Sequence, residues 1–195
     1  MAAKKSQNPQ ENKEKVVKAA LDLAAQQGWD YTSLRDIARA AEVDFADLRL
    51  MFDEKSDILA ALGRMLDYRV LQEAGEAQED VSPRDRLFDL LMERFDALGD
   101  YREGVCAVLE DFKYDPKQAV IALPHLCKSM NWMLEAAGIE TAGIKGALKL
   151  AGLTGLYLKV LRVWKDDESV DLAKTMAALD KGLGRAEGWA ETLGF

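Results

Sequence analysis

Few side chains in this sequence have the types and spacing that covalent chemistry requires. The only histidine, His125, follows Pro124 on an apolar stretch and has no serine or cysteine partner at the spacing of a catalytic motif. The two cysteines, Cys106 and Cys127, do not form the CxxC pair of a metal or redox site, and the sequence has no glycine-rich phosphate loop. The sequence therefore predicts neither an enzyme nor a protein with a metal or another cofactor.

Binding chemistry is indicated instead by the stretch AAEVDFADLRLMF, residues 40–52, which has the apolar spacing of the turn and second helix of a helix-turn-helix. Such a helix enters the major groove of DNA, yet this one carries Glu42, Asp44 and Asp47 against a single cation, Arg49. Asp44 is expected to cap the helix, whereas Asp47 has no such structural role. The whole chain is acidic, with 26 Lys and Arg against 34 Asp and Glu and a net charge of −8. Because phosphate neutralisation supplies most non-specific affinity for nucleic acid, such a chain must concentrate its cations locally to bind DNA.

Helices are the elements that would position these residues, because apolar side chains recur with helical period and no segment shows a convincing strand pattern. Gly28 is expected to end the first helix, and Ser33 with Asp36 forms a capping box that begins the second. Pro124 predicts a kink or a split within a later helix. Beyond residue 82 the expected helices span about 83–98, 101–113, 116–137, 142–165 and 169–187. The predicted fold class is all-α.

Two segments, LDLAAQQGWDYTSLRDIARAAEV and LRLMFDEKSDILAAL, resemble the TetR family of one-component regulators over residues 16–66. The shared features include Gly28 with an aromatic residue after it, a Thr-Ser-Leu run, and Phe52 followed after two residues by Lys55. The resemblance implies a TetR-like fold, with an N-terminal three-helix DNA-reading domain and a helical C-terminal domain. It also implies that the C-terminal domain binds a small ligand and that the last two helices build a homodimer.

The resemblance further implies DNA contacts at the start of the second helix and along the third. In this chain the corresponding positions hold Thr32, Ser33, Arg35, Phe45, Ala46, Arg49, Leu50 and Lys55. Arg49 stands where the family usually has Tyr and can still bind phosphate or guanine, whereas Glu42 stands where the family usually has the turn Gly. Two interpretations remain open. Either the head reads DNA with Arg35, Arg49 and Lys55 plus a basic N-terminal arm, or it keeps the fold and no longer binds DNA.

A change of composition at EAGEAQEDVSP, residues 73–83, marks the expected domain connection, because this stretch is acidic and ends at a proline suited to a helix start. We predict a disordered basic arm at residues 1–10 and a helix-turn-helix domain at residues 11–70, with its motif at about 33–52. Residues 71–195 are predicted to form a helical ligand-binding and dimerisation domain.

Methionine, aromatic and leucine residues, and a separate series of small residues, are prominent in the C-terminal part. A cavity for an apolar ligand is expected among Met92, Phe95, Met130, Met133, Leu156 and Tyr157, although residues of these types are also common in an ordinary core. A dimer seam is expected along Ala147, Ala151 and Gly155, which repeat every four residues and leave one helix face bare. Tight packing inside one subunit is the alternative for this stripe.

The segment VWKDDESVDLAKTMAALDKGLGRAEGW, residues 163–189, also resembles the C-terminal region of the ubiquinone-biosynthesis accessory family. Members of that family share the TetR-like fold, bind lipid in an apolar cavity and do not act as regulators. This resemblance implies an alternative function, namely a lipid-binding accessory protein with a degenerate helix-turn-helix that does not bind DNA.

The leading prediction is a ligand-responsive DNA-binding transcriptional regulator of TetR type, acting as a repressor. The expected partners are DNA, an apolar small molecule or lipid, and a second copy of the chain. No run of about 18 apolar residues is present, so no transmembrane segment is expected, and we expect a cytoplasmic protein.

Overall fold

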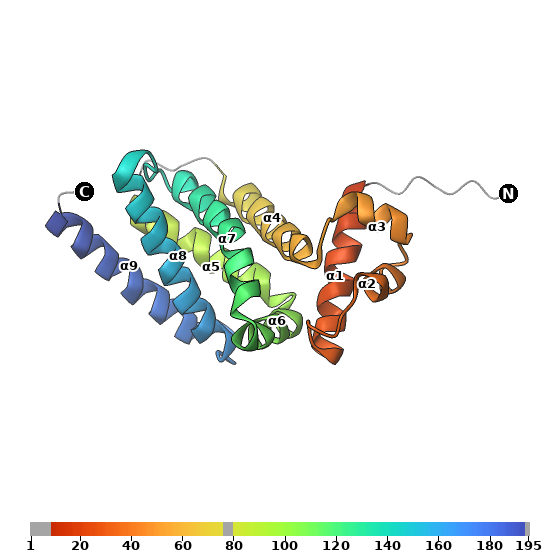
Figure 1. The fold of residues 1–195 in the computed structure, drawn as a ribbon. Coiled ribbons are helices and arrows are strands. Elements are labelled where there is room, and N and C mark those ends of the chain that lie inside the picture. The colour runs from red at the N-terminus through yellow and green to blue at the C-terminus, as the bar shows by residue number, and fades with distance from the viewer. Residues whose placement is uncertain (1–8, 76–79, 194–195) are drawn as a thin grey trace. The chain divides into compact units, whose positions relative to one another are not determined.

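The computed structural model describes residues 9–75 and 80–193, which form helices and no strand (Figure 1). The helices are α1 (Pro9–Gln27), α2 (Leu34–Ala40), α3 (Phe45–Met51), α4 (Lys55–Ala74), α5 (Pro83–Gly99), α6 (Arg102–Tyr114), α7 (Pro116–Ala136), α8 (Gly143–Lys165) and α9 (Ala173–Leu193). The all-α prediction is confirmed. Among the described helices none is long and apolar enough to cross a membrane.

Internal contacts divide the described residues into two compact units. The head unit comprises residues 9–62 and 101–122, which hold α1 to α3, the start of α4, α6 and the start of α7. The body unit comprises residues 63–75, 80–100 and 123–193. Helices α4 and α7 are continuous and contribute residues to both units. The functional division at about residue 70 stays a prediction.

The helix ends of the head unit follow their local sequence signals. Gly28 has a φ of +87° directly after α1, the left-handed conformation that suits a glycine at this position. Ser33 caps α2 by accepting a bond from the Asp36 amide at 3.1 Å, and its hydroxyl donates to the Asp36 carboxylate at 2.5 Å. Asp44 caps α3 by accepting from the Ala46 amide at 2.9 Å. These three predicted signals are confirmed.

Two details near the N-terminus and in α7 differ from expectation. The predicted basic arm at residues 1–10 lies outside the described residues except for Pro9 and Gln10, which belong to α1. Helix α7 runs through Pro124 without interruption, so the predicted split is absent.

The last helix begins at Ala173 and not at residue 169. The Asp167 carboxylate accepts bonds from the Ser169 amide at 3.1 Å and from the Thr175 amide at 2.8 Å, and Ser169 Oγ accepts from the Ala173 amide at 2.9 Å. Leu172 takes a left-handed φ of +52° in the same turn. These side-chain acceptors satisfy the amides before and within the first turn of α9 and delay its start by four residues.

Close helix packing builds each unit separately. In the head unit α1 lies against α6, and a Cβ added at Gly104 would stand 2.4 Å from the carbonyl oxygen of Leu21, so only glycine fits there. In the body unit α9 packs against α5 and α8, and the rings of Phe95 and Tyr157 stack with centroids 4.8 Å apart. The core of each unit is therefore closed around its own helices.

Candidate nucleic-acid interface and ligand cavities

The turn between α2 and α3 has helix-turn-helix geometry and stores local strain. Ile37 and Ala38 of α2 and Leu48 of α3 are buried, so the two short helices share one apolar core. Glu42 lies in the turn with a φ of +55°, a left-handed conformation that is unfavourable for a residue with a Cβ. The TetR pattern described above usually has a glycine at this position. Glycine suits it because glycine has no Cβ and adopts a left-handed φ without strain.

Lys55, at the start of α4, holds the loop that leads into α2. Its ammonium group donates to the carbonyl oxygens of Trp29 and Thr32, the latter at 3.1 Å, and lies 4.7 Å from the centroid of the Trp29 ring. Burial lowers the pKa of Lys55, and the carboxylates of Asp30 and Asp111 act in the opposite direction. Asp111 of α6 supports the same loop by accepting a bond from the Asp30 amide at 3.0 Å. Lys55 is thus placed to position the motif rather than to reach phosphate.

The predicted contacts at the start of α2 divide into structural and exposed side chains. Thr32 is buried and its hydroxyl donates to the Gly28 carbonyl at 2.7 Å. Ser33 uses its hydroxyl in the capping box. Arg35 is exposed, and its guanidinium lies 5.2 Å from the centroid of the exposed Phe45 ring on α3. Of these predicted residues, Arg35 and Phe45 expose their side chains to solvent.

The remaining predicted residues form the outer surface of α3. Ala46 and Arg49 are exposed, and Leu50 is 87% exposed, a large fraction for a leucine. Arg49 forms an ion pair with Asp53, one helical turn further along the chain. A leucine and an alanine one turn apart can contact thymine methyl groups, and an arginine can bond guanine. The exposed face of α3 thus carries apolar side chains and one cation, Arg49.

Acids outnumber cations around the motif. Residues 30–57 contain eight acids, which are Asp30, Asp36, Glu42, Asp44, Asp47, Asp53, Glu54 and Asp57. The same residues contain four cations, which are Arg35, Arg39, Arg49 and Lys55. Eight negative and four positive charges give a net charge of −4, and Lys55 is committed to internal bonds. Within this segment the exposed cations available to DNA are therefore three arginines, Arg35, Arg39 and Arg49.

Most of the predicted ligand-pocket residues lie in the packed core of the body unit. Phe95, Met130, Met133 and Tyr157 are buried, Met92 is half-buried, and none of them lines either of the two cavities described below. Leu156 is the one predicted residue that lines a cavity.

A buried charge network occupies the core beside these residues. The Arg94 guanidinium donates to the Asp67 carboxylate at 3.1 Å, to the Ser129 hydroxyl at 2.9 Å and to the Tyr157 hydroxyl at 2.5 Å. The Ser129 hydroxyl in turn donates to Asp67 at 2.5 Å. Sequence reasoning missed this network. The signal for it is a cation on the apolar face of α5, between Leu91 and Leu98.

The larger cavity of the body unit is apolar. It has a volume of about 620 Å³ and opens between the start of α5, the end of α7, α8 and α9. Its walls are formed by Leu87, Leu134, Ile139, Leu148, Leu153, Leu156 and Leu183. Both its size and its lining fit the ordinary range for small-molecule sites.

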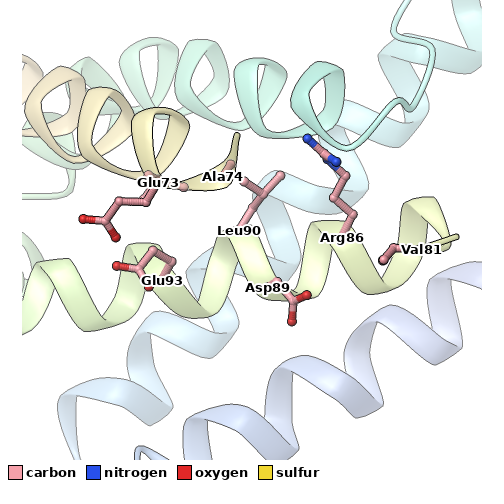
Figure 2. A pocket seen from close by; sticks show the side chains of 8 residues that line it. Glu73, Ala74, Val81, Arg86, Asp89, Leu90 and Glu93 are labelled. Atoms are coloured by element: carbon pink, nitrogen blue, oxygen red, sulfur yellow. The ribbon is translucent and has the colours of Figure 1, made fainter. Parts of the chain in front are cut away.

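The smaller cavity is acidic and has a volume of about 260 Å³. Figure 2 shows the Glu73 side chain of α4 beside the Glu93 side chain of α5. A hydrogen bond with Glu73, partial burial and the neighbouring negative charges raise the pKa of Glu93. Arg86, on the same wall, donates to the carbonyl oxygens of Ala136 at 2.7 Å and Gly75 at 3.3 Å. Within the described parts of the chain, no group of His, Cys, Asp and Glu could hold a metal ion.

The predicted seam residues share one exposed face of α8. Ala147, Ala151 and Gly155 are exposed, and Ile144 beside them is 82% exposed. A Cβ added at Gly155 would meet no atom within 4 Å, so packing inside the protomer does not require glycine there.

Comparison with known proteins identifies the head unit. Residues 16–62 match the family described as "Bacterial regulatory proteins, tetR family". A TetR transcriptional regulator from Nitrosomonas europaea ATCC 19718 is 27% identical, with a TM-score of 0.70 over 90% of this chain and 97% of that one. A search among curated proteins found no match.

Two more distant structures share the fold. A TetR transcriptional regulator from Rhodococcus sp. RHA1 is 17% identical, with a TM-score of 0.60 over 89% of this chain and 94% of that one. A putative TetR-family regulator from Syntrophomonas wolfei is 16% identical, with a TM-score of 0.55 over 94% and 96%. The C-terminal resemblance to the ubiquinone-biosynthesis accessory family stays a prediction. The buried α2–α3 core, the family match over residues 16–62 and the whole-chain similarity agree: the head unit contains a TetR-type helix-turn-helix domain, and the chain has the TetR-like fold of DNA-binding transcriptional regulators.

Proposed function

We propose that the chain is a ligand-responsive repressor that binds DNA as a homodimer. The observation that carries this proposal is the outer surface of α3, where Ala46, Arg49 and Leu50 are exposed on a helix that buries Leu48 on its inner side. A surface leucine that is 87% exposed has no role inside the protomer, whereas a base-reading helix uses apolar side chains against thymine methyl groups.

Homodimer formation is supported by the exposed face of α8. Gly destabilises a helix interior by about 1 kcal/mol relative to Ala. Gly155 gains nothing from packing inside the protomer, and Ile144 exposes most of its side chain. A second copy packed on Ala147, Ala151 and Gly155 would cover this face and allow close helix approach.

Ligand response would follow from the apolar cavity of the body unit. A dimeric helix-turn-helix protein must present its two recognition helices about one turn of DNA apart. An effector that binds one arrangement of the dimer better than the other shifts the population toward that arrangement. If the effector favours an arrangement in which the two recognition helices are no longer one DNA turn apart, the repressor would dissociate from its operator.

The DNA-binding part of the proposal is tested by selecting bound fragments from a genomic library with the full chain. The expected result is a two-fold symmetric site with half-sites about 10 base pairs apart. Arg49→Ala should reduce the enrichment of that site, because it removes an exposed cation of the α3 surface. Lys128→Ala is the matched control, since it removes one exposed cation from the body unit. Equal enrichment with both variants would exclude the α3 surface as the reader.

The homodimer is tested by sedimentation velocity. The wild-type chain should sediment as a dimer, and Ala151→Glu should sediment as a monomer, because it places a charge on the proposed seam. A monomeric wild type would contradict the dimer. Absence of any selected DNA site would instead favour the lipid-binding accessory function.

A further inference from the structure

The larger cavity is an open apolar space that its own protomer does not fill. Its walls come from four helices, and its volume of about 620 Å³ falls within the usual range for sites that take small organic molecules. Six of its side chains are leucines, namely Leu87, Leu134, Leu148, Leu153, Leu156 and Leu183. A ligand with an apolar body would remove this leucine surface from water.

Gly152 keeps the cavity open. It lies in the middle of α8, where glycine is less favourable than alanine. Two other glycines are explained by crowding, because a Cβ at Gly182 would stand 2.2 Å from Leu156 and a Cβ at Gly146 would stand 1.9 Å from the carbonyl of Thr141. A Cβ at Gly152 would meet no atom within 4 Å. A larger side chain at this lining position would project into the cavity.

One of the charged side chains that line the cavity is a cation without an ion-pair partner among the described residues. Arg84, Lys149 and Glu187 line the cavity. Arg84 is paired with Asp85 at 2.9 Å and with Asp180, so its charge is already balanced. Lys149 forms no ion pair with any residue that the structure describes, and Glu187 is the only other charged residue of the lining. Lys149 is therefore the cation available to a ligand head group.

The smaller cavity provides an internal contrast. Glu73, Asp89 and Glu93 line it, and its one cation, Arg86, is bonded to backbone carbonyls. An anionic ligand would be repelled there. The body unit thus offers one cavity whose lining accepts an anionic amphiphile and one whose lining rejects it.

We propose that the larger cavity binds an amphipathic molecule with an apolar body and a single anionic head group, with the head group at Lys149 and the body over Gly152. The proposal rests on the ligand response proposed above and names the chemistry of the effector. The apolar body would cover the leucine walls, and the anionic head would pair with Lys149, which forms no ion pair with any residue that the structure describes. A side chain of a second subunit is the competing occupant.

The test compares two fluorescent probes that share one aromatic scaffold. The anionic probe is 8-anilinonaphthalene-1-sulfonate, and the neutral probe is N-phenyl-1-naphthylamine. Both are titrated into the full dimeric chain without DNA. Gly152→Leu should weaken both probes more than about tenfold, because it fills the cavity. Its melting temperature should equal or exceed that of the wild type, because leucine favours helix more than glycine does.

Lys149→Gln should weaken the anionic probe about fivefold and leave the neutral probe unchanged, as expected for one partly exposed charge interaction. Lys159→Gln is the matched control, since Lys159 is an exposed lysine of α8 that does not line the cavity, and it should change neither probe. Equal effects of Lys149→Gln on both probes, or no effect, would overturn the anionic head group. Unchanged binding to Gly152→Leu would overturn the site.

Protein dilution tests the competing occupant. Probe affinity should not depend on protein concentration if the cavity is free in the dimer. An affinity that rises as the dimer dissociates would show that a partner side chain fills the cavity and would overturn the proposal. The probe titrations contain no DNA, so they test the cavity separately from the ligand response. If the probes bind as expected but do not release the chain from its operator, the ligand response is refuted and the cavity proposal stands.

Discussion

Two arginine–aspartate pairs, one in each unit, have opposite surroundings. In the body unit Arg94 and Asp67 expose 4% and 11% of their side chains and lie 3.1 Å apart within a network that includes Ser129 and Tyr157. In the head unit Arg49 and Asp53 expose 64% and 82% of theirs. The first pair joins two helices, α4 and α5, whereas the second joins residues only four positions apart.

The difference shows which charges are part of the fold and which are available to a partner. A buried pair becomes costly when one member is removed, because the other is left charged and poorly solvated. An exposed pair contributes little to stability, so a phosphate or a guanine can replace its carboxylate partner. Arg94 is thus a structural charge of the body unit, and Arg49 is an exchangeable charge on α3.

The largest expected effect is on stability when the buried pair is broken. Arg94→Ala should lower the free energy of unfolding by about 3–5 kcal/mol, because it leaves the buried Asp67 carboxyl without its main partner. Arg49→Ala should lower it by less than about 0.5 kcal/mol. Urea denaturation of the two variants measures the difference.

The double variant Arg94→Met with Asp67→Leu serves as the control for this comparison. It removes both charges and should recover most of the lost stability, since apolar replacements of a buried pair are often neutral. Similar losses for Arg94→Ala and Arg49→Ala would refute the distinction between the two pairs.

A pH-dependent effect is expected at Asp167. Burial favours its neutral form, but hydrogen bonds from Ser169 and Thr175 outweigh this and hold the pKa of Asp167 well below its usual 3.8. A lowered pKa in the folded chain means that the stabilisation is complete above about pH 4 and disappears as the pH falls further. Asp167→Asn should therefore cost about 2 kcal/mol at pH 7.

The measurement is urea denaturation of wild type and Asp167→Asn at pH 7, 4, 3 and 2. The gap between the two proteins should shrink steadily below pH 4. A gap that stays constant down to pH 2 would show that the carboxylate charge at the start of α9 does not provide the stabilisation.

A smaller effect, of opposite sign, is expected in the turn of the head unit. Glu42→Gly should raise the free energy of unfolding by about 1 kcal/mol, because glycine adopts a φ of +55° without strain. Glu42→Gln removes the charge but keeps the strain, and should leave stability within about 0.5 kcal/mol of wild type. Thermal unfolding of both variants separates strain from charge, and equal stabilisation by both would assign the effect to charge.

The head unit could be predicted from sequence in more detail than the body unit. Its helix ends depend on local signals, such as Gly28 after α1 and the hydrogen bonds between Ser33 and Asp36, and such signals act within a few residues. The role of Lys55 was not predictable in this way. It bonds to carbonyls more than twenty residues away, and a lysine opening a helix near a DNA-reading motif looks the same in sequence whether it contacts phosphate or the protein.

The body unit depends on contacts between distant residues. Arg94 reaches Ser129 and Tyr157 across 35 and 63 residues, and no local pattern indicates such partners. Met130 and Met133 are residue types that often line ligand pockets, but in this structure they are packed in the core. The helical period of a sequence indicates which face of a helix is apolar, but it does not indicate whether a cavity remains beside that face. The start of α9 was misplaced for a related reason, since side-chain acceptors override helix propensity around Ser169.

The smallest expected effect concerns the exposed pair on the head unit. Asp53→Asn should release Arg49 from its ion pair and remove one negative charge from the motif. Affinity for the selected DNA site should rise about threefold, in line with the worth of an exposed pair. Competition binding measures the ratio, and a fall in affinity would show that Asp53 positions Arg49 for DNA.

The most direct test of the account is fluorescence anisotropy of a labelled random-sequence duplex with the full chain over a salt series. The account predicts saturable binding at about 50 mM salt that weakens as salt rises, because exposed arginines neutralise phosphates despite the net charge of −4 around the motif. Arg49→Ala should make the slope of log affinity against log salt less steep by about two units, since a dimer loses two contacts. No binding at 50 mM salt, or a slope that Arg49→Ala leaves unchanged, would contradict the assignment of α3 as a DNA-reading helix.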